Sequence, residues 1–189
     1  MSPRKATIPR AALLLTAALC ATGALTGCQT LTETASASGC EGTGSRVDEL
    51  KSYRILDSRP RGTIEPEGFE GLDAGCWEDS GDVQLYADRT YVFPGDKADV
   101  TRHYRAAAER ADWTPSPATR RSSKNADQPA NLCFTRGGAD DAATLDVYFL
   151  TREILDAEGS AAGPEFGTGA GYRVSVTASA DGSATGCQD

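Results

Sequence analysis

Alternation of apolar and polar side chains marks four stretches of the chain as β-strands. In the first stretch, residues 83–93, four apolar residues share one parity: Val83, Leu85, Tyr91 and Phe93. A strand that is buried on one face shows this period of two. Asp88 and Arg89 stand in its middle, which favours a β-bulge there, with a tight hairpin as the alternative. The alternation recurs in three later stretches, residues 131–136, 144–151 and 172–180.

A helical spacing of apolar residues follows the first predicted strand. The apolar side chains recur every three or four residues at Val100, Tyr104, Ala107 and Ala111. Such a stripe is typical of the buried face of a helix. Asp96 and Asp99 resemble a capping box with Asp in place of Glu, and the two prolines after Trp113 cannot continue a helix. We therefore expect a helix over residues 96–112.

The order of these elements, strand, helix, strand, strand, strand, indicates the fold class. Strands that follow one another without intervening helices favour antiparallel pairing. We expect an α+β domain (β-α-β-β-β) with a small, mainly antiparallel four-stranded sheet and one main helix that covers one face. The other face needs polar side chains or a cover. The stretches 114–130 and 153–171 are polar or rich in glycine and predict loops.

Residues 46–75 are candidates to cover that second face. Ser45 can begin a short helix with three apolar residues on one side: Val47, Leu50 and Tyr53. Prolines and a glycine then break regular structure. We therefore predict an irregular acidic loop over residues 57–75, anchored by three apolar side chains: Ile64, Phe69 and Leu72.

The first 27 residues have the organisation of a secretory signal. Met1–Arg10 is basic, and the uncharged stretch 11–25 that follows is 15 residues long. A membrane-spanning helix needs about 20 apolar residues, so this stretch is too short to span and instead matches the apolar region of a signal peptide. The region has no Arg-Arg pair, which favours the general secretory route.

The signal ends in Leu25-Thr26-Gly27-Cys28, which resembles the lipobox of bacterial lipoprotein signal peptides. In that family the cysteine thiol receives a diacylglyceryl group and the chain is cut just before it. The resemblance therefore implies removal of residues 1–27 and lipidation of Cys28, with an ordinary signal peptide as the alternative. Arg outnumbers Lys 15 to 4, and Ala and Gly are abundant, so the chain resembles a small actinobacterial lipoprotein. That resemblance implies a lipid anchor on the outer face of the cytoplasmic membrane, each buried methylene contributing about 0.8 kcal/mol.

Residues 28–45 predict a flexible tether between that anchor and a folded domain. The segment consists mostly of Thr, Ser, Ala, Gly and Glu, and Leu31 is its one large apolar residue. Such a composition cannot bury enough apolar surface to order itself. The remaining residues, 46–189, suffice for a single domain with one core.

Four cysteines remain in the mature chain once Cys20 leaves with the signal and Cys28 is lipidated: Cys40, Cys76, Cys133 and Cys187. In an oxidising compartment an even number predicts two disulfides. Of the three possible pairings we favour Cys40–Cys187 with Cys76–Cys133, because the ends of a domain often lie close together. Zinc is disfavoured because there is no Cys-x-x-Cys pair, and we expect no metal or cofactor.

Charge narrows the range of partners. The formal net charge of the chain is −8, from 19 basic and 27 acidic residues. Three bases and no acid lie in residues 1–27, so the rest of the chain has 16 bases and 27 acids, a net charge of −11. Nucleic acid and anionic lipid headgroups repel such a surface, and we expect no nucleic-acid partner.

No pattern of residues predicts a catalytic site. His103, the single histidine, falls at the boundary of the predicted helix's apolar stripe and is typical of an ordinary boundary residue. Gly167–Gly171 lacks the following helix of a phosphate loop. The close acidic residues do not have the spacing of an EF-hand loop or are expected by chance: Glu78, Asp79 and Asp82; Glu65 and Glu67; Asp140 and Asp141. Trp77 and Trp113 either pack in the core, which we favour, or line a ligand groove.

These observations favour a non-enzymatic binding domain of the cell envelope, whose partner is an envelope protein or cell-wall material. A small-solute-binding lipoprotein and a carboxylate-based extracellular enzyme are the alternatives. An exposed sheet face with aromatic residues would favour the first, an apolar groove at Trp77 or Trp113 the second, and a pocket that joins His103 to two acids the third.

Overall fold

The computed structural model describes residues 39–122, 128–138, 141–183 and 185–187. Residues 35–189 form one compact unit, which holds the whole core and both disulfides. The predicted signal peptide, Cys28 and the tether up to residue 38 lie outside the described residues. Residues 44 and 45, at the end of the predicted tether, already belong to the first helix.

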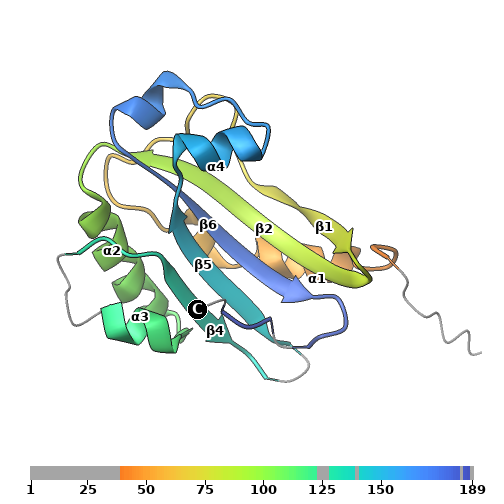
Figure 1. Ribbon diagram of the computed structural model, residues 1–189. Helices are drawn as coiled ribbons and strands as arrows, with labels where there is room; N and C mark the ends of the chain where they lie inside the picture. Colours follow the sequence, from red (N-terminus) through yellow and green to blue (C-terminus); the bar gives the residue numbers. More distant parts are fainter. Residues whose placement is uncertain (1–38, 123–127, 139–140, 184, 188–189) are drawn as a thin grey trace, which may run out of the picture. The chain divides into compact units, whose positions relative to one another are not determined.

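A six-stranded antiparallel sheet organises this unit (Figure 1). The strands are β1 (Asp73–Asp79), β2 (Asp82–Phe93), β3 (Thr114–Pro115), β4 (Leu132–Arg136), β5 (Ala143–Phe149) and β6 (Ala170–Ser179). Their order across the sheet is β1-β2-β6-β5-β4-β3. The chain therefore crosses from β2 to the far edge and returns strand by strand until β6 pairs with β2. The α+β class and the antiparallel pairing agree with the sequence prediction.

The expected number of four strands is wrong, because β1 and β3 join the four predicted ones. The inward-facing residues of β1 include Ala74 and Cys76, which are too small to produce a clear apolar alternation. β3 has two residues, one of them Pro115, and lies at the edge of the sheet, where a proline is tolerated. Neither strand therefore carries the sequence signal on which the prediction depends.

β2 runs without a bulge through Asp88 and Arg89, contrary to prediction. Its register with β1 and β6 is continuous, and Asp88 pairs with Asp73 on one side and Ser175 on the other. The hairpin lies instead at Ser80-Gly81, between β1 and β2, where both residues have positive φ angles. This is the conformation of a type I′ turn, the turn that matches the twist of paired strands.

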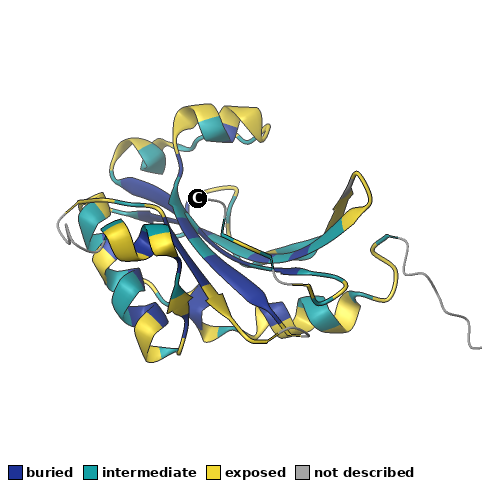
Figure 2. Ribbon diagram, turned by 60° about the horizontal axis from the view of Figure 1, so that its bottom comes forward, coloured by how far each residue is buried: buried dark blue, intermediate teal, exposed yellow. Residues whose placement is uncertain are grey.

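Three helical segments cover one face of the sheet (Figures 1 and 2). They are α1 (Gly44–Lys51), the 3-10 helix η1 (Arg54–Asp57) and α2 (Lys97–Arg110). Leu50, Leu56 and Tyr104 from these segments share one core with Leu85 and Val176 of the sheet. The expectation of a single covering helix is therefore wrong, and the apolar residues at the start of the 46–75 stretch pack on the same face as α2. They extend the cover towards β1 and β2.

α2 matches the predicted helix in position but not in its cap. Val100, Tyr104 and Ala107 are buried as the spacing predicts. Asp96 is the N-cap residue, yet its side chain makes no capping hydrogen bond. Asp99 instead forms an ion pair with Arg102 at 2.6 Å. The predicted capping box is therefore wrong.

Short helices occur in both predicted loops. They are α3 (Pro117–Ser122), α4 (Arg152–Ala157) and the 3-10 helix η2 (Pro164–Gly167). α3 protects the edge of the sheet beyond β3, because the Thr119 hydroxyl accepts from the Cys133 amide (2.8 Å) and donates to the Cys133 carbonyl (3.0 Å). Cys133 pairs with Asp146 on β5, and on its other side, next to the end of β3, these two bonds and the Ser116 amide (2.9 Å) satisfy its backbone groups.

The two disulfides join Cys40 to Cys76 and Cys133 to Cys187, so the favoured pairing is wrong. Cys76 lies in β1 and Cys133 in β4, four strand positions apart. At about 4.8 Å per strand this separation is roughly 19 Å, far beyond the span of a disulfide. The Cα atoms of the observed pairs are 5.7 and 5.8 Å apart. Each end of the unit is therefore fastened to its own side of the sheet.

Candidate functional site

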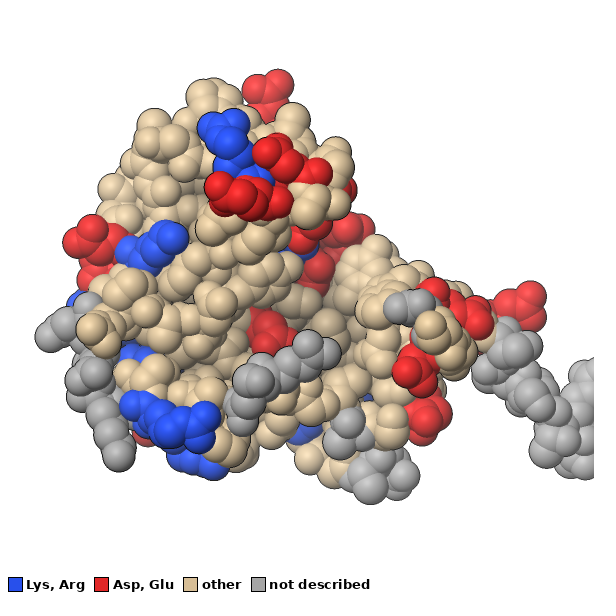
Figure 3. Space-filling view, in the orientation of Figure 1, with Lys and Arg blue, Asp and Glu red and all other residues tan. Residues whose placement is uncertain are grey.

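The second face of the sheet is polar, and within the described part of the chain no helix covers its middle (Figure 2). Polar side chains alternate along three neighbouring strands with the core residues of the other face: Tyr86, Asp88 and Thr90 of β2; Arg173, Ser175 and Thr177 of β6; Thr144, Asp146 and Tyr148 of β5. We call this surface the open face. Figure 3 shows acidic side chains in its middle. The sequence predicts either polar side chains or a cover for this face, and the structure has polar side chains there.

Two aspartates lie on the floor of the open face, on either side of Ser175. The register pairs Asp88 with Ser175 and Ser175 with Asp146, so the three side chains form one row across β2, β6 and β5. The Ser175 hydroxyl faces Asp88 and favours the charged form of that carboxyl group, which acts to lower its pKa. Among the described residues, the buried Oδ1 atom of Asp88 has no hydrogen-bond partner. Ser175 itself is buried, so the row lies within the surface and not on a rim.

Burial raises the pKa of both carboxyl groups in this row to about 6. For Asp88, the negative charges of Asp73 and Glu158 add to the rise, while the Ser175 hydrogen bond and Arg173 oppose it. For Asp146, the charge of Asp88 adds to the effect of burial. Carboxyl groups with raised pKa values in a cleft are typical of functional sites.

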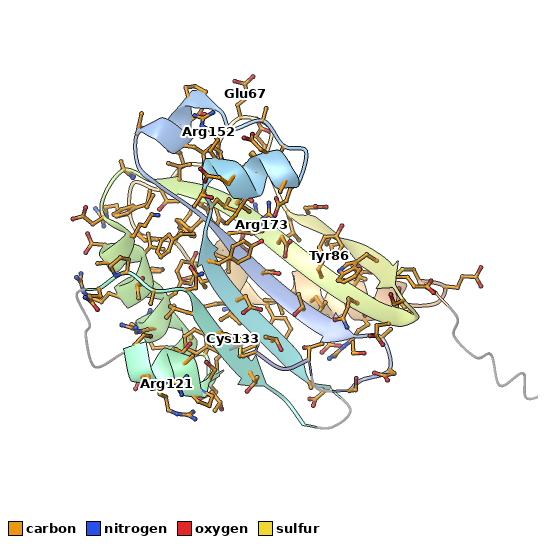
Figure 4. All side chains as sticks on the ribbon, in the orientation of Figure 1. Glu67, Tyr86, Arg121, Cys133, Arg152 and Arg173 are labelled. Atoms are coloured by element: carbon orange, nitrogen blue, oxygen red, sulfur yellow. A yellow bond between two sulfur atoms is a disulfide. The ribbon has the colours of Figure 1, made fainter. Side chains whose placement is uncertain are left out.

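Arg173 places a positive charge on the open face, and three residues hold it through four hydrogen bonds. Its two terminal nitrogens bind the two carboxylate oxygens of Glu158 at 3.0 and 2.7 Å. It also donates to the Tyr148 hydroxyl (3.0 Å) and to Thr90 Oγ1 (3.3 Å). Desolvation is the largest single effect and acts to lower the pKa of Arg173. The hydrogen bond with Glu158 and the charges of Tyr148, Glu158 and Asp88 together outweigh it, so the pKa is raised overall. Figure 4 labels Arg173 on β6, Tyr86 on the neighbouring strand β2 and Cys133 on β4.

Two clefts open on this face, one at each end of the row. Asp88, Thr90 and Arg173 line a cleft of about 500 Å³ next to Glu158. Asp146, Tyr148 and Ser175 line another of about 520 Å³. Both volumes lie within the range of small-molecule sites.

Segments at two ends border the open face. α4 lies over the end where β5 finishes and β6 begins (Figures 1 and 2). At the opposite end the C-terminal segment crosses β5 and β4, where Thr144 hydrogen-bonds Thr185 (Oγ1 to Oγ1, 2.7 Å) and Cys187 is bonded to Cys133. The carboxylate row lies between these two segments.

Trp77 extends the open face onto the edge strand β1. Its side chain is 50% exposed, and Trp77 pairs with Gln84 on β2. The Tyr86 ring lies against Gly75, where a Cβ would be 3.0 Å from the Tyr86 hydroxyl. Glycine at position 75 therefore lets a second aromatic ring lie close to the sheet. Core packing, the favoured prediction for Trp77, is wrong, whereas Trp113 is 4% exposed and belongs to the core.

His103 does not join the acids of the open face. Its Nε2 lies 3.0 Å from Ser58 Oγ, and its ring packs edge-on against Tyr104 on the covered side of the sheet. Burial, together with the charge of Arg110, lowers the pKa of His103. The prediction of an ordinary boundary histidine agrees with these contacts.

Of the other acidic and glycine-rich candidates, Glu65 has structural partners, and Asp140 lies outside the described residues. Glu65 accepts from the Gly71 amide (3.0 Å) and pairs with Arg59 (2.9 Å). The Gly71 bond is the largest cause that lowers the pKa of Glu65, which therefore favours its charged form. Gly167–Gly171 leads from η2 into β6 and not into a helix. Asp82 lies at the Ser80-Gly81 turn, and among the described residues no group of three His, Cys, Asp or Glu side chains can hold a metal ion.

Sequence reasoning did not select Asp88, Asp146, Arg173 or Ser175. The available signal was a charged residue on the polar parity of a strand: Asp146 stands between Leu145 and Val147. Charged residues at such positions are ordinary when that face meets solvent. Only the register, which joins two distant stretches of chain across β6, places the two aspartates in one row.

No helix within the described ranges is long and apolar enough to cross a membrane. Comparison with known proteins gives no family model, no curated protein and no solved structure that matches the chain.

Proposed function

We propose that the chain is a lipoprotein of the outer face of the cytoplasmic membrane, anchored through Cys28, and that its domain is a non-enzymatic binding module. The observation that carries the binding role is the open face, a wide polar surface with the buried carboxylates of Asp88 and Asp146 on its floor. The lipobox residues Leu25–Cys28 support the anchor.

The chemistry of the open face defines the kind of partner that suits it. Its carboxylates and hydroxyl groups match a partner that presents hydrogen-bond donors or positive charge, and the exposed ring of Trp77 supplies apolar contact. Aromatic rings of this kind are enriched at the centre of interfaces. An envelope protein or cell-wall material with amino or hydroxyl groups has these properties.

Labelling with a radioactive fatty acid tests the anchor. Wild-type cells should incorporate the label into the protein, and cells that express Cys28→Ala should not. The Cys40→Ala/Cys76→Ala variant is the matched control, because it removes two cysteines and leaves position 28 intact. Equal labelling of wild type and Cys28→Ala would contradict the anchor.

Photocrosslinking on intact cells tests the use of the open face. A photoreactive amino acid replaces Tyr86 on the open face or, as the matched control, Lys51 on α1 at the covered side. Position 86 should give a discrete crosslinked species that position 51 lacks, and Asp88→Asn with Asp146→Asn should weaken it. The same species at both positions, or none at position 86, would contradict the proposal.

Carboxylate chemistry is a second candidate function, favoured by the pKa of about 6 of both Asp88 and Asp146. Near neutral pH such a pair can supply one protonated and one ionised carboxyl group, as general acid and base. Hydrolysis of chromogenic glycosides and esters by the 35–189 unit tests this function. A rate that both Asp88→Asn and Asp146→Asn abolish supports it, and identical rates in the wild type and these variants contradict it.

A further inference from the structure

A separate apolar slot lies at the other edge of the sheet, between α2, α3 and the strands β3 and β4. It has a volume of about 330 Å³. Its lining residues are Arg105, Glu109, Trp113, Pro115, Thr119, Arg120 and Phe134. Trp113 and Phe134, both less than 5% exposed, contribute apolar surface, and the Thr119 hydroxyl is already used by the backbone of Cys133.

Arg105 enters this slot with an unbalanced charge. Among the described residues its guanidinium makes one hydrogen bond, to Ser122 Oγ at 2.8 Å, and the Ser122 hydroxyl itself donates to the Thr119 carbonyl. Nε of Arg105 is buried and has no partner in the same part of the chain. Burial lowers the pKa of Arg105, and within the described residues no carboxylate forms an ion pair with it. A half-buried charge of this kind is normally paired.

A second guanidinium borders the same slot from α3. Arg120 donates to the Pro115 carbonyl at its mouth. Figure 3 shows basic side chains gathered over α3, and Arg121, labelled in Figure 4, lies on the same helix. Although the chain as a whole is acidic, basic side chains therefore gather at this edge. Glu109, which is exposed, is the one acid of the lining.

We propose that the slot binds a small organic anion, a carboxylate or phosphate joined to an apolar group of about one ring, with its charge on Arg105 and its ring on Trp113 and Phe134. The volume is at the lower end of the range for small-ligand sites, which limits the ligand to this size. Within the described ranges, Arg105 has donors without a partner in the planar fork that suits carboxylate and phosphate oxygens. The site is independent of the open face and of the proposed envelope partner.

The two tryptophans provide the readout, since Trp113 lies at the slot and Trp77 on the open face. Benzoate, phenyl phosphate and the neutral control benzamide are titrated into the ¹⁵N-labelled 35–189 unit. Benzoate or phenyl phosphate should shift the indole NH signal of Trp113 and leave that of Trp77 unchanged, and benzamide should shift neither. Saturation by only one of the two anions identifies the preferred headgroup. Failure of both anions to shift Trp113, or equal shifts of both tryptophans, would overturn the proposal.

Charge variants locate the anion. Arg105→Gln should weaken binding roughly tenfold, since it removes a charge-assisted hydrogen bond. Glu109→Gln, the matched variant one helical turn away, should strengthen binding about twofold because it removes a repelling charge. Arg105→Lys keeps the charge and separates electrostatic attraction from the geometry of the fork. Unchanged affinity of a folded Arg105→Gln variant, with native amide signals, would exclude the site.

Discussion

Asp88 and Asp146 lie on the two strands that flank Ser175, and burial raises the pKa of each carboxyl group to about 6. Near neutral pH both groups are mostly ionised, although the fold favours their protonated forms. An asparagine at either position would avoid that cost while keeping a hydrogen-bonding side chain. A residue that lowers stability where another residue type would not is typical of a functional surface, because its role lies in binding or chemistry.

The pH dependence of stability tests the free-energy cost of keeping Asp88 and Asp146 ionised. The pKa of an aspartate in the unfolded chain is about 3.9, so a folded value of about 6 means that the native state binds more protons between these values. The stability that these protonated carboxyl groups contribute is therefore fully present below about pH 4 and is lost as the pH rises through 6. Asp88→Asn should be more stable than the wild type by about 1–3 kcal/mol at pH 7.5 and show no such gain at pH 4. Urea unfolding at both pH values measures the difference.

Asp156→Asn on α4 is the control for this experiment, because Asp156 is exposed and lies outside the row. It should follow the wild type at both pH values. A gain in Asp88→Asn that is the same at pH 4 and pH 7.5 would show that the substitution acts by packing and not by charge.

Much of the sheet is predictable from the sequence because its strands are amphipathic. β2, β4, β5 and β6 each bury one parity of side chains in the core, and this produces the alternation that identifies them. Asp88 and Arg89 interrupt the apolar pattern of β2 for different reasons. Asp88 faces the open face, whereas Arg89 lies on the covered parity and reaches Asp57 at 3.0 Å and Glu65 at 3.4 Å. The regular strand β2 therefore accommodates both charges in its middle without a bulge.

The features that escaped prediction depend on contacts between distant parts of the chain. The disulfide partners follow from the position of β1 and β4 at opposite sides of the sheet, which local patterns do not determine. The carboxylate row likewise depends on β6, the last strand, lying between β2 and β5. His103 and Glu65 were candidate site residues because of their chemical type alone, and both have structural partners.

Arg173 should support both the stability and the electrostatics of the open face. Arg173→Gln removes the paired hydrogen bonds to Glu158 and the bond to Tyr148, and we expect the free energy of unfolding to fall by about 2–3 kcal/mol. The pKa of Asp88 should rise further, because the positive charge that opposes the rise is gone. Carboxyl ¹³C titration by NMR and urea unfolding measure the two effects. Arg173→Lys separates them: it should restore the pKa of Asp88 and only part of the stability.

His103 should behave as a packing residue. Its folded pKa lies below the ordinary 6.5, so protonation favours the unfolded state and stability falls as the pH drops below that value. The ring C2 proton should titrate below 6.5 in NMR spectra. His103→Gln keeps a hydrogen-bonding partner for Ser58 and should cost less than about 1 kcal/mol at pH 7.5. Loss of crosslinking from position 86 in this variant would contradict a purely structural role.

The disulfide between Cys133 and Cys187 should control access to the open face as well as stability. The two disulfides close separations of 36 and 54 residues, and the loop-closure model gives about 4 kcal/mol for each. Cys133→Ala with Cys187→Ala should therefore cost about as much stability as Cys40→Ala with Cys76→Ala. Only the former frees the C-terminal segment that crosses β4 and β5, so hydrogen exchange of residues 180–187 should rise in that variant alone. Peptide mapping without reductant should find the two observed pairs, and a Cys76–Cys133 peptide would contradict the sheet order from which this prediction is derived.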